Sequence, residues 1–257
     1  PAKTTDEKPV SYTLETATGT LPDFGDRAEV YFMPKASASL LADQGTRNLV
    51  AKYGFLFEPE ILGDELYRFS KTAPFTSTMD INIRTQNFTM RTNYLDLPEL
   101  LVNPSPPTAF DAVASVKSFL RLGDLLPEDV ATASGAVVYL KSLGGELTPA
   151  VSQSDADFIQ VDLGRGLIDE VYNTYTPAGY EGIITAIITG KSNQDNGIVE
   201  ISKRYNTVDY EQVHTYPLRS AQSAWQLLQA GEGYVASKGS HQQAIIRSVE
   251  LGYYDSF

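Results

Sequence analysis

The candidates for chemistry in this chain are its acidic residues, its two histidines and its tyrosines. The chain contains no cysteine. Asp155 and Asp157, in the stretch Ser-Asp-Ala-Asp, form the most suggestive acidic pair. Two carboxylates of this kind could bind a divalent cation or act as the acid and base of a glycoside hydrolase. In a chain with 32 acidic residues they also fit a solvated loop that enters a strand, which is the interpretation we favour.

The two histidines, His214 and His241, lie far apart in the sequence, and we expect each in a loop. A Ser-His-Asp site could use either one, but the sequence has no Gly-x-Ser-x-Gly nucleophile motif. It also has no His-Glu-x-x-His zinc motif, no P-loop and no glycine-rich dinucleotide fingerprint. We therefore predict no catalytic, cofactor-binding or metal-binding residue, and a protein that is not an enzyme.

Tyrosines gather at several places in the second half of the chain. A rigid aromatic ring that carries a hydroxyl suits the recognition of proteins or sugars. Tyrosines in strands also cover half-buried sheets without any binding role. The possible interaction surface consists of Tyr172, Tyr175, Tyr180, Tyr205 and Tyr210.

The composition excludes several classes of function. Twenty Lys and Arg against 32 Asp and Glu give a net charge of −12, which disfavours binding to nucleic acids and to anionic membranes. Without cysteine there is no disulfide and no thiolate metal site. The 257 residues suit one large or two small domains, and no run of about 20 apolar residues could span a bilayer.

Local patterns place these residues on an α+β fold with two modules, each a helix packed on an antiparallel sheet. Residues 1–27 read as an extended arm or linker with one strand near 10–14. The first module, 28–103, is predicted to contain a strand at 28–34, a helix at 39–53 and strands at 66–70, 78–85 and 87–94. The prolines of 104–107 predict a stiff connector between the modules.

The second and larger module covers 108–257. Thr108 is expected to cap a helix that runs to 122 with Phe110, Val116 and Phe119 on its apolar face. Strands are predicted at 135–140, 157–163, 171–174, 182–189 and 197–205. Ser220 is expected to cap a helix at 221–230 that Gly231 ends, and a single last strand is predicted at 244–254.

Four stretches of this second module carry a family resemblance. They are Ala156-Asp-Phe-Ile-Gln-Val-Asp162, Tyr180-Glu-Gly-Ile-Ile-Thr-Ala-Ile-Ile188, Tyr216-Pro-Leu-Arg-Ser-Ala-Gln-Ser-Ala-Trp-Gln-Leu-Leu-Gln-Ala-Gly231 and Ile245-Ile-Arg-Ser-Val-Glu-Leu-Gly-Tyr-Tyr254. This succession resembles the YycH/YycI-like regulatory proteins of bacteria. In that family a Tyr-Pro turn precedes a helix, and a Gly-Tyr-Tyr-like ending closes a strand.

The resemblance implies a non-enzymatic, membrane-anchored protein whose folded part lies outside the cytoplasmic membrane, in the cell envelope or at the cell surface. Its implied partner is another envelope or membrane protein, such as a sensor histidine kinase, with no cofactor and no nucleic acid. The chain begins at Pro1, and we expect an upstream anchor to provide its contact with the membrane. The alternatives are a cell-surface adhesion or glycan-binding module and, third, a hydrolase that uses Asp155 and Asp157.

Overall fold

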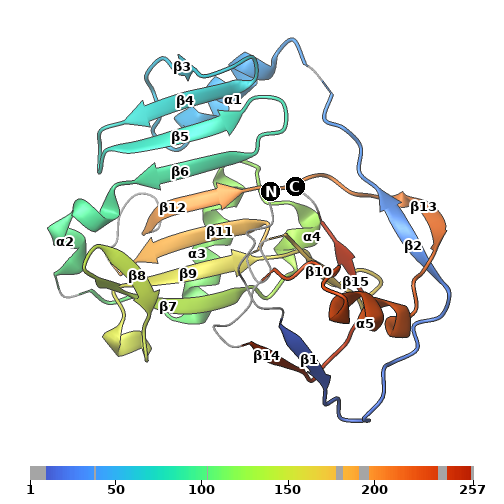
Figure 1. Cartoon of the computed structure of the whole chain (residues 1–257). Coiled ribbons are helices and arrows are strands. Elements are labelled where there is room, and N and C mark those ends of the chain that lie inside the picture. Colours follow the sequence, from blue (N-terminus) through green and yellow to red (C-terminus); the bar gives the residue numbers. More distant parts are fainter. Residues whose placement is uncertain are drawn as a thin grey trace.

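A large antiparallel sheet forms the centre of the molecule (Figure 1). The structure is a computed structural model and describes residues 10–37, 39–102, 104–177, 182–190, 197–236 and 242–255. Within these residues the sheet has nine strands. In spatial order they are β3 (Glu60–Ile61), β4 (Leu66–Lys71), β5 (Ser77–Asn82), β6 (Phe88–Thr92), β12 (Ile198–Lys203), β11 (Ile184–Thr189), β9 (Phe158–Leu163), β7 (Ala136–Leu143) and β8 (Glu146–Pro149).

One face of this sheet is buried beneath helices. Period-two alternation directs Met79 and Ile81 of β5 to this face, where both are buried. Helix α1 (Ala42–Ala51) adds Leu49 and Val50 to the same core. Helix α3 (Ala109–Leu122) and the short α4 (Glu128–Ala131) complete the cover. The predicted cap is confirmed, because Thr108 Oγ1 accepts a hydrogen bond from the backbone N–H of Asp111.

The opposite face of the sheet is largely polar. Over the central strands it carries Thr89, Arg91, Gln160, Thr185, Glu200 and Ser202. A smaller apolar cluster covers one end of this face, where Tyr94 packs edge-on against Phe158 at 5.1 Å between ring centroids. It includes the short helices η1 (Tyr94–Asp96) and α2 (Pro98–Leu101), and η2 (Gln153–Asp155) lies before β9. The sheet is therefore buried mainly on the helical side.

A second group of elements, which we call the peripheral lobe, lies beside the large sheet (Figure 1). It consists of three two-stranded sheets and one helix. Strand β2 (Arg27–Phe32) pairs antiparallel with β13 (Asp209–Pro217). Strands β1 (Ser11–Leu14) and β14 (Gln243–Ile246) pair in parallel, as do β10 (Asn173–Tyr175) and β15 (Gly252–Tyr254). Helix α5 (Ala221–Gln229) begins after the predicted cap, Ser220, whose Oγ accepts from Ser223 N–H.

The predicted α+β class, with helices packed on an antiparallel sheet, is confirmed. The division into two modules is not confirmed, because β6 from the first predicted module pairs with β12 from the second within one sheet. Strand β2, expected in the first module, pairs with β13 instead. Part of the predicted N-terminal arm also joins the second half of the chain, since β1 pairs with β14.

Two local predictions are wrong. The single last strand predicted at 244–254 is two strands, because β14 and β15 belong to different sheets and the chain must turn between them. Gly252 lets β15 approach β10 closely, since a Cβ there would lie 2.5 Å from the Tyr175 ring. Phe110 was expected on the buried face of α3 but is 82% exposed, whereas Val116 and Phe119 are buried as predicted.

Candidate functional site

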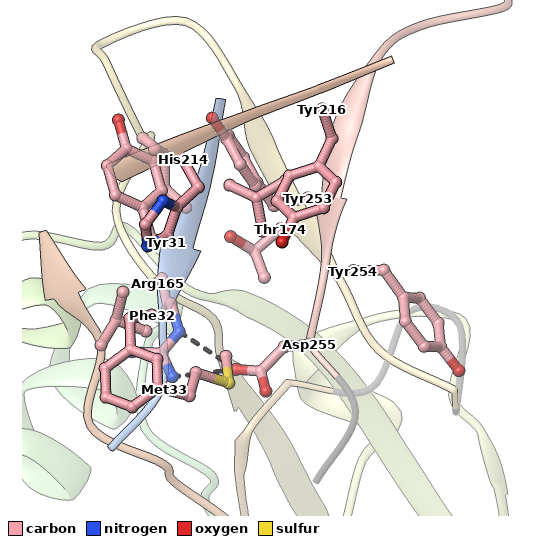
Figure 2. Close-up of a pocket in the computed structure, with 13 residues that line it drawn as sticks. Tyr31, Phe32, Met33, Arg165, Thr174, His214, Tyr216, Tyr253, Tyr254 and Asp255 are labelled. Atoms are coloured by element: carbon pink, nitrogen blue, oxygen red, sulfur yellow. Dashed lines mark hydrogen bonds and ion pairs between the residues drawn. The ribbon is translucent and has the colours of Figure 1, made fainter. Parts of the chain in front are cut away.

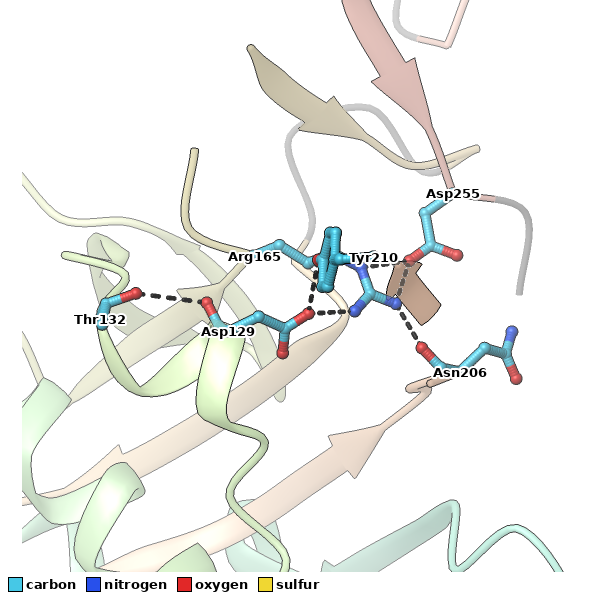
Figure 3. Close-up of polar contacts among 6 residues, drawn as sticks. All are labelled: Asp129, Thr132, Arg165, Asn206, Tyr210 and Asp255. Carbon is cyan, nitrogen blue, oxygen red and sulfur yellow. Dashed lines mark hydrogen bonds and ion pairs between the residues drawn. The ribbon is translucent and has the colours of Figure 1, made fainter. Parts of the chain in front are cut away.

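A buried cluster of charges ties the peripheral lobe to the large sheet (Figure 3). The Arg165 side chain, just after β9, is 1% exposed. Its Nε and Nη2 donate to Asp255 Oδ2 at 3.0 and 2.9 Å, and Nη2 also donates to the Asn206 carbonyl at 2.5 Å. Its Nη1 pairs with Asp129 Oδ2, at the start of α4. One guanidinium therefore joins four segments that are distant in sequence.

Aromatic rings surround this cluster. The Arg165 guanidinium lies 4.5 Å from the centroid of Tyr205, and Lys203 Nζ lies 5.5 Å from the same ring. The Tyr210 hydroxyl donates to Asp129 Oδ2 at 3.0 Å. Burial and the nearby Asp129 carboxylate raise the pKa of Tyr210 to about 12, so its hydroxyl stays protonated at neutral pH.

A chain of tyrosines leads from this cluster toward the surface. Tyr31 of β2 packs against Tyr210 at 5.3 Å and Tyr253 at 5.5 Å between ring centroids. Tyr253 packs edge-on against Tyr172 at 5.8 Å. The Tyr31 hydroxyl donates to Asp169 Oδ1 at 2.7 Å. Burial and this carboxylate raise the pKa of Tyr31, which therefore remains a hydrogen-bond donor.

The turn that carries Asp169 has an uncommon backbone. Asp169 and Glu170 have φ of 52° and 60°, and Val171 N–H donates to the Ile168 carbonyl. Positive φ at both central residues is the geometry of a type I′ turn, which favours Asn, Asp or Gly. Holding a glutamate there costs about 1 kcal/mol. Backbone strain of this kind is concentrated at functional sites in proteins, and here the turn carries the carboxylate to which Tyr31 donates.

Two adjoining cavities lie along β2 and β15, and we call them together the tyrosine groove. Their volumes are about 370 and 460 Å³. They share Val30, Tyr253 and Tyr254, and the first also contains His214 and Tyr216 of β13 (Figure 2). His214, predicted in a loop, is therefore a strand residue that lines the groove. His241 lies outside the described residues.

Two residues that line the first cavity each have a buried side-chain oxygen without a hydrogen-bond partner among the described residues. Asp255 is 1% exposed, and its Oδ1 has no hydrogen-bond partner among the described residues. The same is true of Thr174 Oγ1, in β10 beside Tyr253. Both residues line the first cavity with Arg165 (Figure 2). A buried polar atom without a partner costs about 1–3 kcal/mol, so a ligand that supplied donors here would recover part of that cost.

The predicted interaction residues fall around this groove to different degrees. Tyr172 lines the second cavity, and Tyr210 contacts Tyr31. Tyr205 is half-buried beneath Arg165. Tyr175 is 36% exposed, and its hydroxyl is hydrogen-bonded to Glu250. Tyr180 lies outside the described residues.

The structure gives Asp155 and Asp157 structural contacts. Asp155 pairs with Lys141 of β7, and that ammonium lowers the pKa of the carboxyl. Asp157 Oδ2 accepts a hydrogen bond from Ser142 N–H at 2.8 Å. Neither residue lines the tyrosine groove. These contacts fasten the loop before β9 to β7, which matches the favoured interpretation of a solvated loop that enters a strand.

Sequence reasoning missed Arg165, Asp129, Asp255 and Thr174. Arg165 lies between two glycines in Gly164-Arg-Gly166, a segment without regular secondary structure after β9, and its side chain organises the site. Tyr31 lies in an apolar run that reads only as a strand. An arginine two residues after β9, a strand buried along most of its length, is the sequence signal that could have identified the cluster.

No group of three His, Asp or Glu is placed to hold a metal ion among the residues that the structure describes. Within the same residues, no helix is long and apolar enough to cross a membrane. Comparisons of the chain with protein-family models, with curated proteins and with solved structures found no match.

Proposed function

We propose that this chain is a non-enzymatic binding domain of a membrane-anchored bacterial envelope protein, which acts outside the cytoplasm by binding another envelope protein. The observation that carries this proposal is the tyrosine groove, where exposed rings stand over a buried polar floor. Aromatic anchors beside buried polar groups are typical of protein interfaces. The resemblance to YycH/YycI-like proteins supports the location and a partner in signalling.

The charges around the groove favour binding over chemistry. Arg165 is held by Asp129 and Asp255, and Tyr31 by Asp169. These groups are fixed in ion pairs and hydrogen bonds, which suits a rigid recognition surface. The ribbon of β2 and β13 adds exposed aromatic side chains to the lining of the groove, with Phe32 46% and Tyr216 56% exposed.

Site-directed photo-cross-linking tests the proposal. The photoreactive residue p-benzoylphenylalanine replaces Tyr216 at the groove, and a control variant carries it in place of Phe110 on α3, which is 82% exposed. We expect one protein from an envelope extract to cross-link at position 216 and not at position 110. Tyr253→Ala should abolish that product. Equal labelling from both positions, or a product that Tyr253→Ala does not change, would contradict the proposal.

A glycan-binding module is the second candidate, because exposed tyrosine faces beside the carboxylates of Glu29 and Asp169 also suit a sugar ring. Saturation-transfer NMR with cell-wall oligosaccharides distinguishes the two. Transfer to the sugar that Tyr253→Ala removes would favour the glycan, and its absence would favour the protein partner.

A further inference from the structure

We propose that the tyrosine groove accepts a cationic side chain, a lysine ammonium or an arginine guanidinium, presented by the protein partner. This inference rests on the proposed function and adds the chemistry of the partner. Three features of the groove support it, which are its negative charge, its aromatic rings and the two buried oxygen atoms without hydrogen-bond partners, Asp255 Oδ1 and Thr174 Oγ1.

The charge of the groove and its floor is negative. Glu29 and Asp169 line the second cavity, Asp255 lines the first, and Asp129 lies behind Arg165. Against the three carboxylates that line the cavities stand the guanidinium groups of Arg27 and Arg165, which leaves a net charge of −1. In the described part of the chain Glu29 forms no ion pair, and burial raises the pKa of Tyr31 and of Tyr253, with the Glu29 charge adding a smaller contribution. A partner cation would offset the excess negative charge.

The rings provide faces on which a cation can rest. Tyr31, Tyr172 and Tyr253 form a continuous series of ring contacts beside the two carboxylates. Cations are attracted to aromatic faces, and the attraction grows when water is partly excluded. The protein uses the same geometry internally, where Arg165 and Lys203 lie against Tyr205.

The two unpartnered oxygen atoms of the cavity lining can accept hydrogen bonds from a ligand. Asp255 Oδ1 is a carboxylate oxygen and can only accept, and Thr174 Oγ1, from the lining of the same cavity, can also accept. Ammonium and guanidinium groups supply three and five donors and accept none. A neutral hydroxyl or an amide could satisfy the floor but would leave the charge of the groove unbalanced, so the three features together favour the cation.

Tyrosine-labelled NMR tests the inference with small probes. The probes are N-acetyl-arginine methylamide and N-acetyl-lysine methylamide, with N-acetyl-citrulline methylamide as the neutral analogue of the first. We expect both cationic probes to shift the signals of Tyr31, Tyr172 and Tyr253 saturably, and citrulline to bind at least about fivefold more weakly. Equal affinity for arginine and citrulline, or no saturable shift from either cation up to 50 mM, would overturn the assignment.

Substitutions of the groove carboxylates test whether Glu29 and Asp169 supply the negative charge that binds the cationic probes. Glu29→Gln with Asp169→Asn should weaken the arginine probe about fivefold, and asparagine tolerates the positive φ of position 169. A control pair away from the groove, Asp64→Asn with Glu146→Gln, removes the same charge and should change nothing. Thr174→Val should weaken the probe by removing one acceptor. An unchanged affinity in the first pair, or an equal loss in both pairs, would refute the inference.

The cross-linking experiment separates this inference from the proposed function. If position 216 cross-links to a partner but no cationic probe binds, the inferred cation binding is wrong and the proposed protein-binding function stands. Cation binding without a cross-linked partner would support the groove chemistry and contradict the partner.

Discussion

Lys203 is a buried ammonium next to the site, and its replacement by methionine should stabilise the protein at neutral pH. The residue ends β12 and is 5% exposed. Its Nζ lies 3.4 Å from the Gln86 carbonyl oxygen and 5.5 Å from the centroid of the Tyr205 ring. No ion pair to Lys203 forms among the described residues, and burial lowers its pKa to about 8. The charged form is therefore poorly compensated.

The magnitude follows from this lowered pKa. A fall from the ordinary value of 10.5 to about 8 corresponds to a cost of about 3 kcal/mol for the buried charge at neutral pH. Methionine would lose the long hydrogen bond to Gln86 and the contact with Tyr205, which together are worth about 1.5–2 kcal/mol. We expect Lys203→Met to raise the free energy of unfolding by about 1–2 kcal/mol at pH 7.

The stability difference between the Lys203→Met variant and the wild type depends on pH in a direction that follows from the lowered pKa. Below about pH 8 the ammonium is charged in the folded and unfolded chains, so its cost is fully present. Between about pH 8 and 10.5 the folded chain has lost the proton that the unfolded chain keeps, so the wild type gains stability relative to the variant. The advantage of the methionine variant should therefore shrink as the pH rises through this window.

Urea denaturation of both proteins at pH 7, 8, 9 and 10 measures this difference, in which the other lysines and tyrosines cancel. Lys35→Met, at an exposed position, is the matched control and should change stability by less than about 0.5 kcal/mol at every pH. A methionine variant that is less stable at pH 7, with a difference that does not vary with pH, would refute the reasoning. It would mean that the ammonium stabilises the fold through Gln86 and Tyr205.

Three further substitutions test the scaffold of the site by urea denaturation. Arg165→Met should cost about 3–5 kcal/mol, because it leaves Asp129 and Asp255 buried without their cation, and a loss below about 1 kcal/mol would contradict that role. Thr108→Ala should cost about 1 kcal/mol by removing the cap of α3 while Thr108→Ser restores it, and equal stability of the two variants would count against the cap. Gly182→Ala should cost about 2 kcal/mol or more, because its Cβ would lie 2.4 Å from the Leu163 carbonyl oxygen, and wild-type stability would show that the backbone can move apart there.

The sequence predicted most strands of the large sheet, although not their union in one sheet, because one face of the sheet is buried. Met79 and Ile81 alternate with polar residues, and that alternation is the burial pattern of β5. The helix caps Thr108 and Ser220 were also correct, because capping depends on a few adjacent residues. Local rules therefore sufficed wherever local interactions or a single buried face determine the structure.

Local sequence patterns could not predict the peripheral lobe or the site. Strand β13 is exposed along most of its length, so no burial pattern marks its pairing with β2. The charge cluster joins Asp129, Arg165 and Asp255, which are 36 and 90 residues apart along the chain. The tyrosine clusters of the sequence include Tyr172 and Tyr210, but their ring partners, Tyr253 and Tyr31, come from the two ends of the chain. Only the tertiary fold brings such residues together.

The most direct test of the account combines the photoreactive residue at position 216 with the neutralised groove. The measurement is the yield of the cross-linked partner in the Glu29→Gln, Asp169→Asn background, compared with the Asp64→Asn, Glu146→Gln background. The account predicts that the yield falls at least about fivefold in the first background and stays at the wild-type level in the second. An equal yield in the two backgrounds would contradict the claim that the tyrosine groove recognises a cationic side chain of a protein partner.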